Sequence, residues 1–189
     1  MPNTSIGLSK PYIATYAENS GSPTYSSGKS LGMATEFSVT VDGKDPANLF
    51  ADNGPAESVA MFGGGTATLG VHKLTLSNLA ALLGQSYVSS TGCDFKAEAT
   101  APYIGLGVIS MDISGGTITY SVILLYKVQC KAPDITRVTR GETIEFQVPN
   151  LEFNILRDDS SDAKWMWVQD GYATEALAEA GLKAKLGIS

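Results

Sequence analysis

The sequence predicts a mainly β (α+β) fold, a sandwich or barrel to which two helices are added. Two adjacent segments, 101–113 and 117–130, are rich in Ile, Val and Tyr and flank a Gly-Gly pair, which is typical of a β-hairpin. Ser and Thr supply 35 of the 189 residues while charged residues make up only 17%, a balance typical of β proteins. This length is enough for one well-buried core, so we expect a single domain over residues 1–189.

Other strands are expected on both sides of this central hairpin. Residues 35–42 alternate between apolar and polar side chains, which predicts a strand. A second strand is expected over 66–76, with a bulge or break near Lys73, where the alternation changes phase. Further apolar segments predict strands at 142–149, 151–156 and 164–169.

Two helices complete the predicted fold. Ser77 and Gly84 are suitable ends for a helix of about two turns, which must pack on the sheet because it is too short to be stable alone. Its apolar face would consist of Leu79, Leu82 and Leu83. Thr174 is expected to cap a C-terminal helix. The shared face of that helix would consist of Ala173, Leu177, Ala180 and Ala184.

Two segments lack a regular period. Residues 1–34, punctuated by Pro and Gly and carrying isolated tyrosines, predict an extended N-terminal arm. Residues 43–65 predict a long loop, because they contain two prolines, three consecutive glycines and no repeating pattern. This loop also carries apolar residues that are unfavourable in water. Two interpretations stay open: a loop folded over its own core, or an arm buried against another subunit.

Composition argues against several classes of protein. The net charge of −6 is opposite to that of an ordinary nucleic-acid binder, which gains affinity from lysines and arginines. The first residues have neither the positive region nor the apolar stretch of a signal peptide. The longest apolar run, 122–126, is far shorter than the roughly 20 residues that cross a bilayer. We therefore expect a soluble intracellular product, in which Cys93 and Cys130 need no disulfide.

Catalytic and metal-binding patterns are weak. His72 is the only histidine, and no nucleophile motif lies near it, so a core or surface role is favoured over a Ser-His-Asp or Cys-His system. Asp158, Ser160 and Asp162 have the spacing that opens a calcium loop, but Ala163 occupies the glycine position, which favours a solvated acidic turn. We expect no enzyme, no metal site and no cofactor. A β hydrolase built around His72 or a carboxylate pair is the lesser alternative.

Two tryptophans provide an alternative of a different class. Trp165 and Trp167 lie two residues apart in an expected strand and therefore on one face. Paired aromatic rings can stack on sugars, so a carbohydrate-binding β-sandwich, as in an adhesion module, is a real alternative. Tryptophans that fill a core or an interface are more common.

Several short motifs occur in one order from about residue 7 to residue 170. They include Gly7–Tyr12 (GLSKPY), Leu31–Ala34 (LGMA), Asn48–Asn53 (NLFADN), Gly65–Gly70 (GTATLG), Ala101–Gly107 (APYIGLG), Leu125–Val128 (LYKV) and Arg140–Gln147 (RGETIEFQ). With this ordered set, the chain resembles the major tail proteins, or tail tube proteins, of long-tailed non-contractile bacteriophages.

This resemblance implies a structural role in the virion. Such proteins form hexameric rings whose sheets join into a continuous barrel around a channel, and the rings stack into the tube through which DNA passes without specific binding. The implied partners are further copies of the chain, a tape-measure protein and tail completion or initiator proteins. Assembly would take place in the cytoplasm of the host bacterium. A tail completion protein of similar fold, which stops at one ring, is a related alternative.

If the chain is a tail tube protein, we expect one set of its residues to contact neighbouring subunits. The loop would supply inter-ring contacts through Leu49, Phe50, Asp52, Asn53 and Phe62, and the N-terminal arm would assist through Tyr12 and Tyr16. The alternative is that Asp52-Asn53-Gly54 is only a turn. We also expect some acidic residues to face the channel, because a basic lumen would hold DNA by its phosphates.

Overall fold

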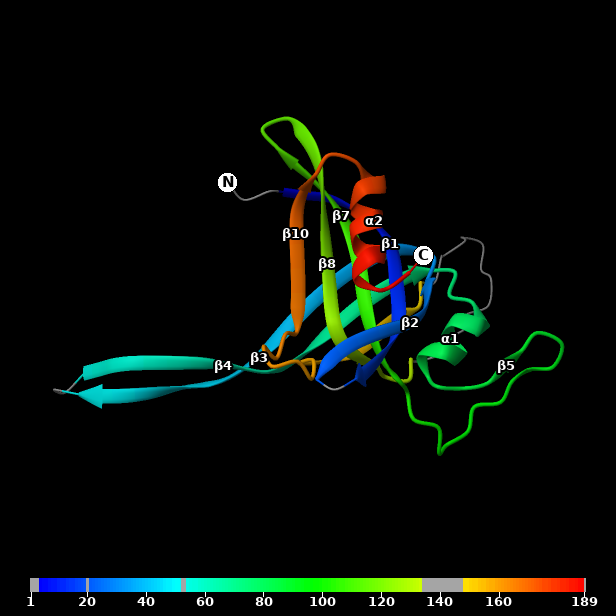
Figure 1. Cartoon of the computed structure of the whole chain (residues 1–189), viewed down its shortest axis with the longest axis horizontal. Helices are drawn as coiled ribbons and strands as arrows, with labels where there is room; N and C mark the ends of the chain where they lie inside the picture. Colours follow the sequence, from blue (N-terminus) through cyan, green and yellow to red (C-terminus); the bar gives the residue numbers. More distant parts are fainter. Residues whose placement is uncertain (1–3, 20, 52–53, 134–147, 189) are drawn as a thin grey trace, which may run out of the picture.

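The computed structural model describes residues 4–19, 21–51, 54–133 and 148–188. Within these residues the chain is mainly β, as the sequence predicts (Figure 1). The strands are β1 (Thr4–Asn19), β2 (Ser22–Ser30), β3 (Met33–Ala51), β4 (Gly54–His72), β5 (Tyr87–Val88), β6 (Gly92–Cys93), β7 (Tyr103–Ser114), β8 (Thr117–Cys130), β9 (Asn150–Leu156) and β10 (Met166–Tyr172). The helices are α1 (Leu76–Leu82) and α2 (Glu175–Lys185).

One antiparallel sheet contains all strands except β5 and β6. Its order is β2-β1-β7-β8-β9-β4-β3, with β10 also paired to β8. The sheet divides at β8, because residues 120–125 of β8 pair with β10 and residues 127–130 pair with β9. β1 also lies against β3, and the Leu31 amide donates a hydrogen bond to the Pro11 carbonyl at 2.9 Å. The sheet therefore curls into an open barrel.

The barrel core lies on the inner face of this sheet. Alternate residues of β7, such as Leu106 and Val108, are fully buried there beside Leu69 of β4 and Phe153 of β9. Leu82 of α1 joins them, so the short helix closes one side of the barrel, as its length requires. Residues 104–110 of β7 are all buried, because alternate side chains enter the barrel core and those between them face the other side of the sheet.

A second cluster, the helix core, lies on the opposite face of β7 and β8. There Ile109, Val122 and Leu124 are fully buried under Leu182 of α2 and Leu186, the residue that caps the C-terminal end of the helix. Thr174 caps α2 as predicted, since its hydroxyl accepts a hydrogen bond from the Leu177 amide at 3.3 Å. Figure 1 shows α2 lying alongside the strands rather than beyond their ends.

The predicted face of α2 is wrong. The helix buries Ala178, Leu182 and Leu186, while Leu177 is 56% exposed and the other members of the predicted face, Ala173, Ala180 and Ala184, are also exposed. The sequence holds two apolar stripes, because alanines lie on several sides of this helix. The sheet accepts the stripe that carries two leucines four residues apart, which buries more apolar area.

The predicted loop over 43–65 is a β-hairpin. β3 and β4 continue from the barrel into this segment and pair with each other from Gly43–Phe62 to Ala51–Gly54. The ladder contains several register shifts, which hide the two-residue period from sequence inspection. We call residues 43–51 and 54–62 the β3–β4 hairpin. Figure 1 shows it projecting from the barrel on the side opposite to α1 and β5.

The predicted N-terminal arm over 1–34 is also corrected. β1 pairs with β2 and with β7, so most of this segment belongs to the sheet. Its prolines are tolerated because Pro11 lies at a register shift between β1 and β7, where the ladder is already interrupted.

The other predicted elements agree with the structure or differ at their ends. The hairpin β7–β8 turns at Gly115-Gly116, and β4 ends at His72, followed by Lys73 with a left-handed φ of 64°. The first helix is capped by Thr75 rather than Ser77. The expected strand at 142–149 lies largely outside the described residues. The small β5–β6 pair was not predicted, because two-residue strands leave no period in the sequence.

Candidate assembly surface

The β3–β4 hairpin projects from the barrel (Figure 1). Beyond Gly65, which still pairs with Ile155 of β9, the two strands pair only with each other among the described residues. Both outer edges of the projecting ladder therefore offer unpaired backbone amides and carbonyls, which is the usual starting point for pairing with another chain.

Four of the predicted contact residues fall in or near the tip of this hairpin. Leu49 and Phe50 belong to β3, where their backbones pair with Glu57 and Pro55 of β4. Their side chains are outside the described part of the structure, and so are Asp52 and Asn53 altogether. The structure thus brings Leu49 and Phe50 to the projecting end, and their contacts with another subunit stay a prediction.

Phe62 has a partner within its own chain. Its ring stacks on the indole of Trp165 with a centroid distance of 4.9 Å and an interplanar angle of 11°. Both rings pack against the barrel core at the point where the hairpin leaves the barrel. Phe62 therefore fixes the base of the hairpin to the segment that precedes β10.

Tyr12 and Tyr16 also have intramolecular partners. The Tyr12 hydroxyl donates to Glu179 Oε1 of α2 at 2.6 Å. Tyr16, only 7% exposed, donates to Asp159 Oδ2 at 2.8 Å, and the ammonium of Lys127 reaches the same oxygen at 2.6 Å. Burial raises the pKa of Tyr16 to about 12, so this phenol stays protonated as a donor. These tyrosines hold the sheet to the C-terminal third of the chain.

A third open edge runs along β10. Among the described strands, β10 pairs only with β8, so its other edge is free. Met166 and Val168 lie on the barrel-core side of this strand, yet Val168 is 50% exposed. An edge strand with exposed apolar side chains is a surface that a neighbouring subunit can cover.

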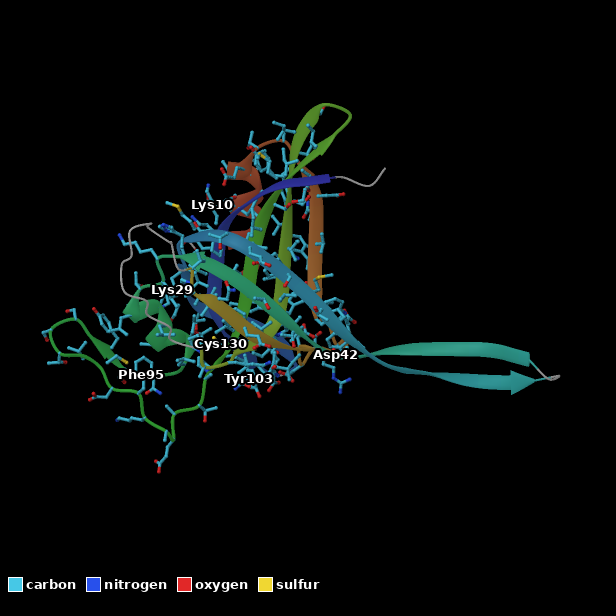
Figure 2. All side chains as sticks on the ribbon, turned by 180° about the vertical axis from the view of Figure 1, so that it is seen from behind. Lys10, Lys29, Asp42, Phe95, Tyr103 and Cys130 are labelled. Atoms are coloured by element: carbon cyan, nitrogen blue, oxygen red, sulfur yellow. The ribbon has the colours of Figure 1, made fainter. Side chains whose placement is uncertain are left out.

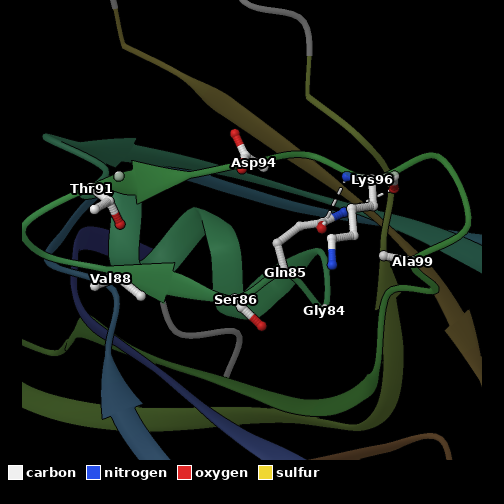
Figure 3. Close-up of a pocket in the computed structure, with 9 residues that line it drawn as sticks. Gly84, Gln85, Ser86, Val88, Thr91, Asp94, Lys96 and Ala99 are labelled. Atoms are coloured by element: carbon white, nitrogen blue, oxygen red, sulfur yellow. Dashed lines mark hydrogen bonds between the residues drawn. The ribbon is translucent and has the colours of Figure 1, made fainter.

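The loop that follows α1 forms a second projection, which sequence reasoning missed. Tyr87, Val88 and Phe95 are exposed there, and Figure 2 shows Phe95 at the end of the molecule opposite to Asp42, which lies at the base of the β3–β4 hairpin. A cavity of about 300 Å³ lies beside this loop (Figure 3). The Gln85 side chain stabilises the loop: it accepts a hydrogen bond from the Lys96 amide and donates one to the Lys96 carbonyl, both at 3.2 Å.

The outward face of β3, β4 and β9 is polar along its length. Residues on it alternate with those of the barrel core and are exposed or half-buried: Glu36, Ser38, Thr40, Thr66, Thr68, Asn150, Glu152 and Asn154. Among the described residues of this region, Glu152 forms an ion pair with Lys131 at 2.7 Å, while Glu36 has no ion-pair partner. This face carries hydroxyls, amides and carboxylates and suits contact with water.

The two tryptophans and Asp158 of the acidic turn each contact other residues of the same chain. Trp165 stacks on Phe62, and the ammonium of Lys185 lies 4.9 Å from the ring centre of Trp167. In the acidic turn, Asp158 Oδ1 accepts hydrogen bonds from the Ser160 hydroxyl at 2.7 Å and the Lys164 amide at 2.7 Å. Each ring thus has a protein group over one of its faces. The expected common face of the two tryptophans is wrong, because Trp165 precedes β10 and packs against the barrel core, whereas Trp167 packs against the helix core on the opposite side of the sheet. Asp158 serves to close a turn.

Other candidate chemistry gains no support from the geometry. In the described part of the chain, no group of three or more His, Cys, Asp or Glu side chains is arranged to hold a metal ion. His72 is exposed at the end of β4, and both cysteines are free. Of the helices that the structure describes, neither has the length and apolar character required to cross a membrane.

No protein-family model matches this sequence, and no curated protein matches it significantly. The assignment of function therefore depends on the chain's own residues and geometry.

Proposed function

We propose that the protein is a structural subunit of a phage tail tube, which assembles with copies of itself into stacked hexameric rings. The observation that carries this proposal is the β3–β4 hairpin, a ladder that leaves the barrel and pairs with nothing else among the described residues. The open edges of such a ladder can pair with another chain, so a subunit of an assembly can bury them against a neighbour.

The open sheet edges support assembly by closed rings. The β10 edge and the hairpin edges lie on different parts of the molecule, so a contact between them would join two unlike surfaces. Repeated contacts between unlike surfaces generate rings when the rotation closes. Strand pairing across subunits would supply the backbone hydrogen bonds that these edges lack within one chain.

The polar outward face of β3, β4 and β9 is the proposed lining of the channel. Its Glu36 carboxylate, which has no ion-pair partner among the described residues, would repel DNA phosphates and help the duplex slide, whereas the charge of Glu152 is balanced by Lys131. The proposed partners are other copies of the chain, a tape-measure protein and completion or initiator proteins, and the proposed location is the virion, after assembly in the bacterial cytoplasm. A tube structure with a net positive lumen would contradict this part of the proposal.

The test is negative-stain electron microscopy of the purified protein over a concentration series, with light scattering on the same samples. We expect hollow tubes or stacked rings at high concentration. Single rings that never stack would instead indicate a tail completion protein. A monomer at all concentrations, even after addition of an initiator complex, would contradict the proposal, and glycan-dependent quenching of tryptophan fluorescence would then identify a carbohydrate-binding module.

A further inference from the structure

The C-terminal helix covers a core that is separate from the interior of the barrel. Leu182 of α2 and its C-terminal cap residue Leu186 pack with Ile109, Val122 and Leu124 in the helix core. Among the described residues, the barrel core on the other face of the sheet contains no residue of α2. Loss of the α2 contacts would therefore leave the interior packing of the barrel in place, which is the condition for local rather than global opening.

The surface beneath α2 is unusually flat. A side chain at Gly107 would collide with Leu182, and one at Gly105 would lie 2.8 Å from Leu186. The same holds for Gly28 of β2, where a Cβ would collide with Ile188 after the helix. Leu182, Leu186 and Ile188 thus lie directly against the backbone of β7 and β2 at these glycines.

The polar contacts of α2 with the sheet converge on one short stretch of β1. Glu179 accepts hydrogen bonds from Lys10 at 2.5 Å and from the Tyr12 hydroxyl at 2.6 Å. Ser9 donates to Glu175 at 2.7 Å. Lys183, one turn further along α2, pairs with Glu179 at 3.0 Å. We call Glu179 and its three partners, Lys10, Tyr12 and Lys183, the Glu179 latch.

The backbone under the latch is strained. Lys10 has a left-handed φ of 46°, a conformation that residues other than glycine rarely adopt. It lies at the register shift between β1 and β7, where regular pairing is interrupted. Such strain persists only where the surrounding contacts hold it, and here the ion pair of Lys10 with Glu179 is one of them.

We propose that α2 is a releasable cover, which undocks from β1, β7 and β8 as one unit when the Glu179 latch opens, while the barrel core stays folded. This device is independent of the assembly role proposed above. Its release would uncover an apolar strip made by Ala14, Ile109, Val122 and Leu124 on the outer face of the sheet. The charged and titratable groups that face Glu179 are Lys10 and Tyr12 of β1 and Lys183 and Glu175 of α2; Tyr172 of β10 lies against Gly181 on the same helix.

The test is hydrogen–deuterium exchange of the full-length protein at neutral pH, followed by mass spectrometry. In the wild type we expect amides of residues 178–186 to exchange faster than those of β7 and β8, and to exchange faster still at high salt. The substitution Glu179→Gln should accelerate exchange in α2 by about ten-fold or more, because it removes the negative charge that pairs with Lys10 and Lys183 and replaces one of the two accepting oxygens by an NH2 group. The β7 and β8 amides should keep their wild-type rates.

Glu175→Gln is the matched control, since glutamine can still accept the hydrogen bond of Ser9 and the latch around Glu179 stays intact. We expect less than a three-fold change in α2 exchange for this variant, because the Lys10–Glu175 pair is long, at 3.6 Å, and exposed. Equal exchange rates for α2 and β7 in the wild type would overturn the proposal. So would a Glu179→Gln effect spread evenly over the chain. The salt series on the wild type decides the question even if a variant fails to fold.

Discussion

The ring of Phe62 lies nearly parallel to the indole of Trp165, with a centroid distance of 4.9 Å. Phe62 belongs to β4, where the hairpin leaves the barrel, and Trp165 immediately precedes β10. This stack joins two segments that are about a hundred residues apart in the sequence. The stack links the base of the β3–β4 hairpin to the start of β10. It therefore helps to fix the orientation of the hairpin relative to the open edge of β10, the two surfaces proposed to contact neighbouring subunits.

Replacing Phe62 by alanine is expected to lower the free energy of unfolding by about 2 kcal/mol, because the half-buried ring and its stack are both lost. Urea unfolding followed by circular dichroism measures this change, and the emission of Trp165 should shift to the red. Phe95→Ala is the control: Phe95 is 49% exposed and should change stability by less than about 0.5 kcal/mol. Equal effects of the two substitutions would contradict the assigned role of Phe62.

A methyl group at Gly107 should destabilise the docked helix. Gly107→Ala places a Cβ against Leu182, and we expect a loss of about 1–3 kcal/mol through overpacking. Gly43→Ala, at a β3 glycine with open space around its Cα, is the matched control and should be nearly neutral. Thermal unfolding of the two variants beside the wild type measures the difference. A stable Gly107→Ala protein with unchanged hydrogen exchange in α2 would show that the helix can shift to accommodate a methyl group at this position of β7.

The stability that Glu179 provides is expected to disappear in acid. The hydrogen bond from Lys10, with those from Tyr12 and Lys183, lowers the pKa of Glu179 from 4.5 to about 2. Since the folded pKa lies below the unfolded one, the contribution is fully present above about pH 5 and is lost as the pH falls through 4.5 toward 2. Urea unfolding at several pH values should therefore show wild type and Glu179→Gln converging below pH 4. A constant difference between them down to pH 2 would argue against the latch.

The two cysteines should differ sharply in reactivity. Burial raises the pKa of the Cys130 thiol to about 12, and its side chain is packed in the barrel core. Cys93 is half-buried in β6 and accessible. At pH 8 we expect rapid maleimide labelling of one thiol per chain, detected by mass spectrometry, and none in Cys93→Ser until the protein is unfolded. Two fast-reacting thiols in the native wild type would mean that the barrel opens readily.

A charge at Phe50 should block polymerisation. Phe50 lies in the projecting part of β3, and Phe50→Asp would place a carboxylate in the proposed dry contact between subunits. Folding of the subunit should be unaffected, because this part of the ladder pairs only with β4 among the described residues. Light scattering and electron microscopy measure assembly, while circular dichroism checks the fold. Normal tubes formed by Phe50→Asp would remove Phe50 from the contact.

Sequence patterns predicted the elements whose burial follows a simple period. The predicted strand at 35–42, which alternates between apolar and polar side chains, lies within β3. The hairpin β7–β8 was predicted by composition instead: a Gly-Gly turn joins two long runs rich in Ile, Val and Tyr, and both of their faces are buried, one in the barrel core and the other in the helix core. In both cases the local pattern and the tertiary environment agree.

The sequence patterns failed where the structure of a segment depends on what it packs against. The face of α2 depends on the glycine-flattened surface of β7, which is far from α2 in the sequence. The β3–β4 hairpin has register shifts, which interrupt the two-residue period by which a strand is identified in a sequence. Of the candidate site, the sequence located Leu49 and Phe50 on the projecting segment. It could not reveal that Phe62, Tyr12 and Tyr16 are bound within the chain, since each partner lies more than 100 residues away.

The uninterrupted passage of β3 and β4 from the barrel into the hairpin has a mechanical consequence. Nine projecting residues at about 3.3 Å each make a lever on the order of 30 Å long. A pull along this lever is carried by the two backbones together and loads in shear the hydrogen bonds between β4 and β9, so the pairs from Gly65 to Gly70 share the force. A force across the ladder would instead bend it at the register shifts, where regular pairing is interrupted, while the segments between them stay stiff.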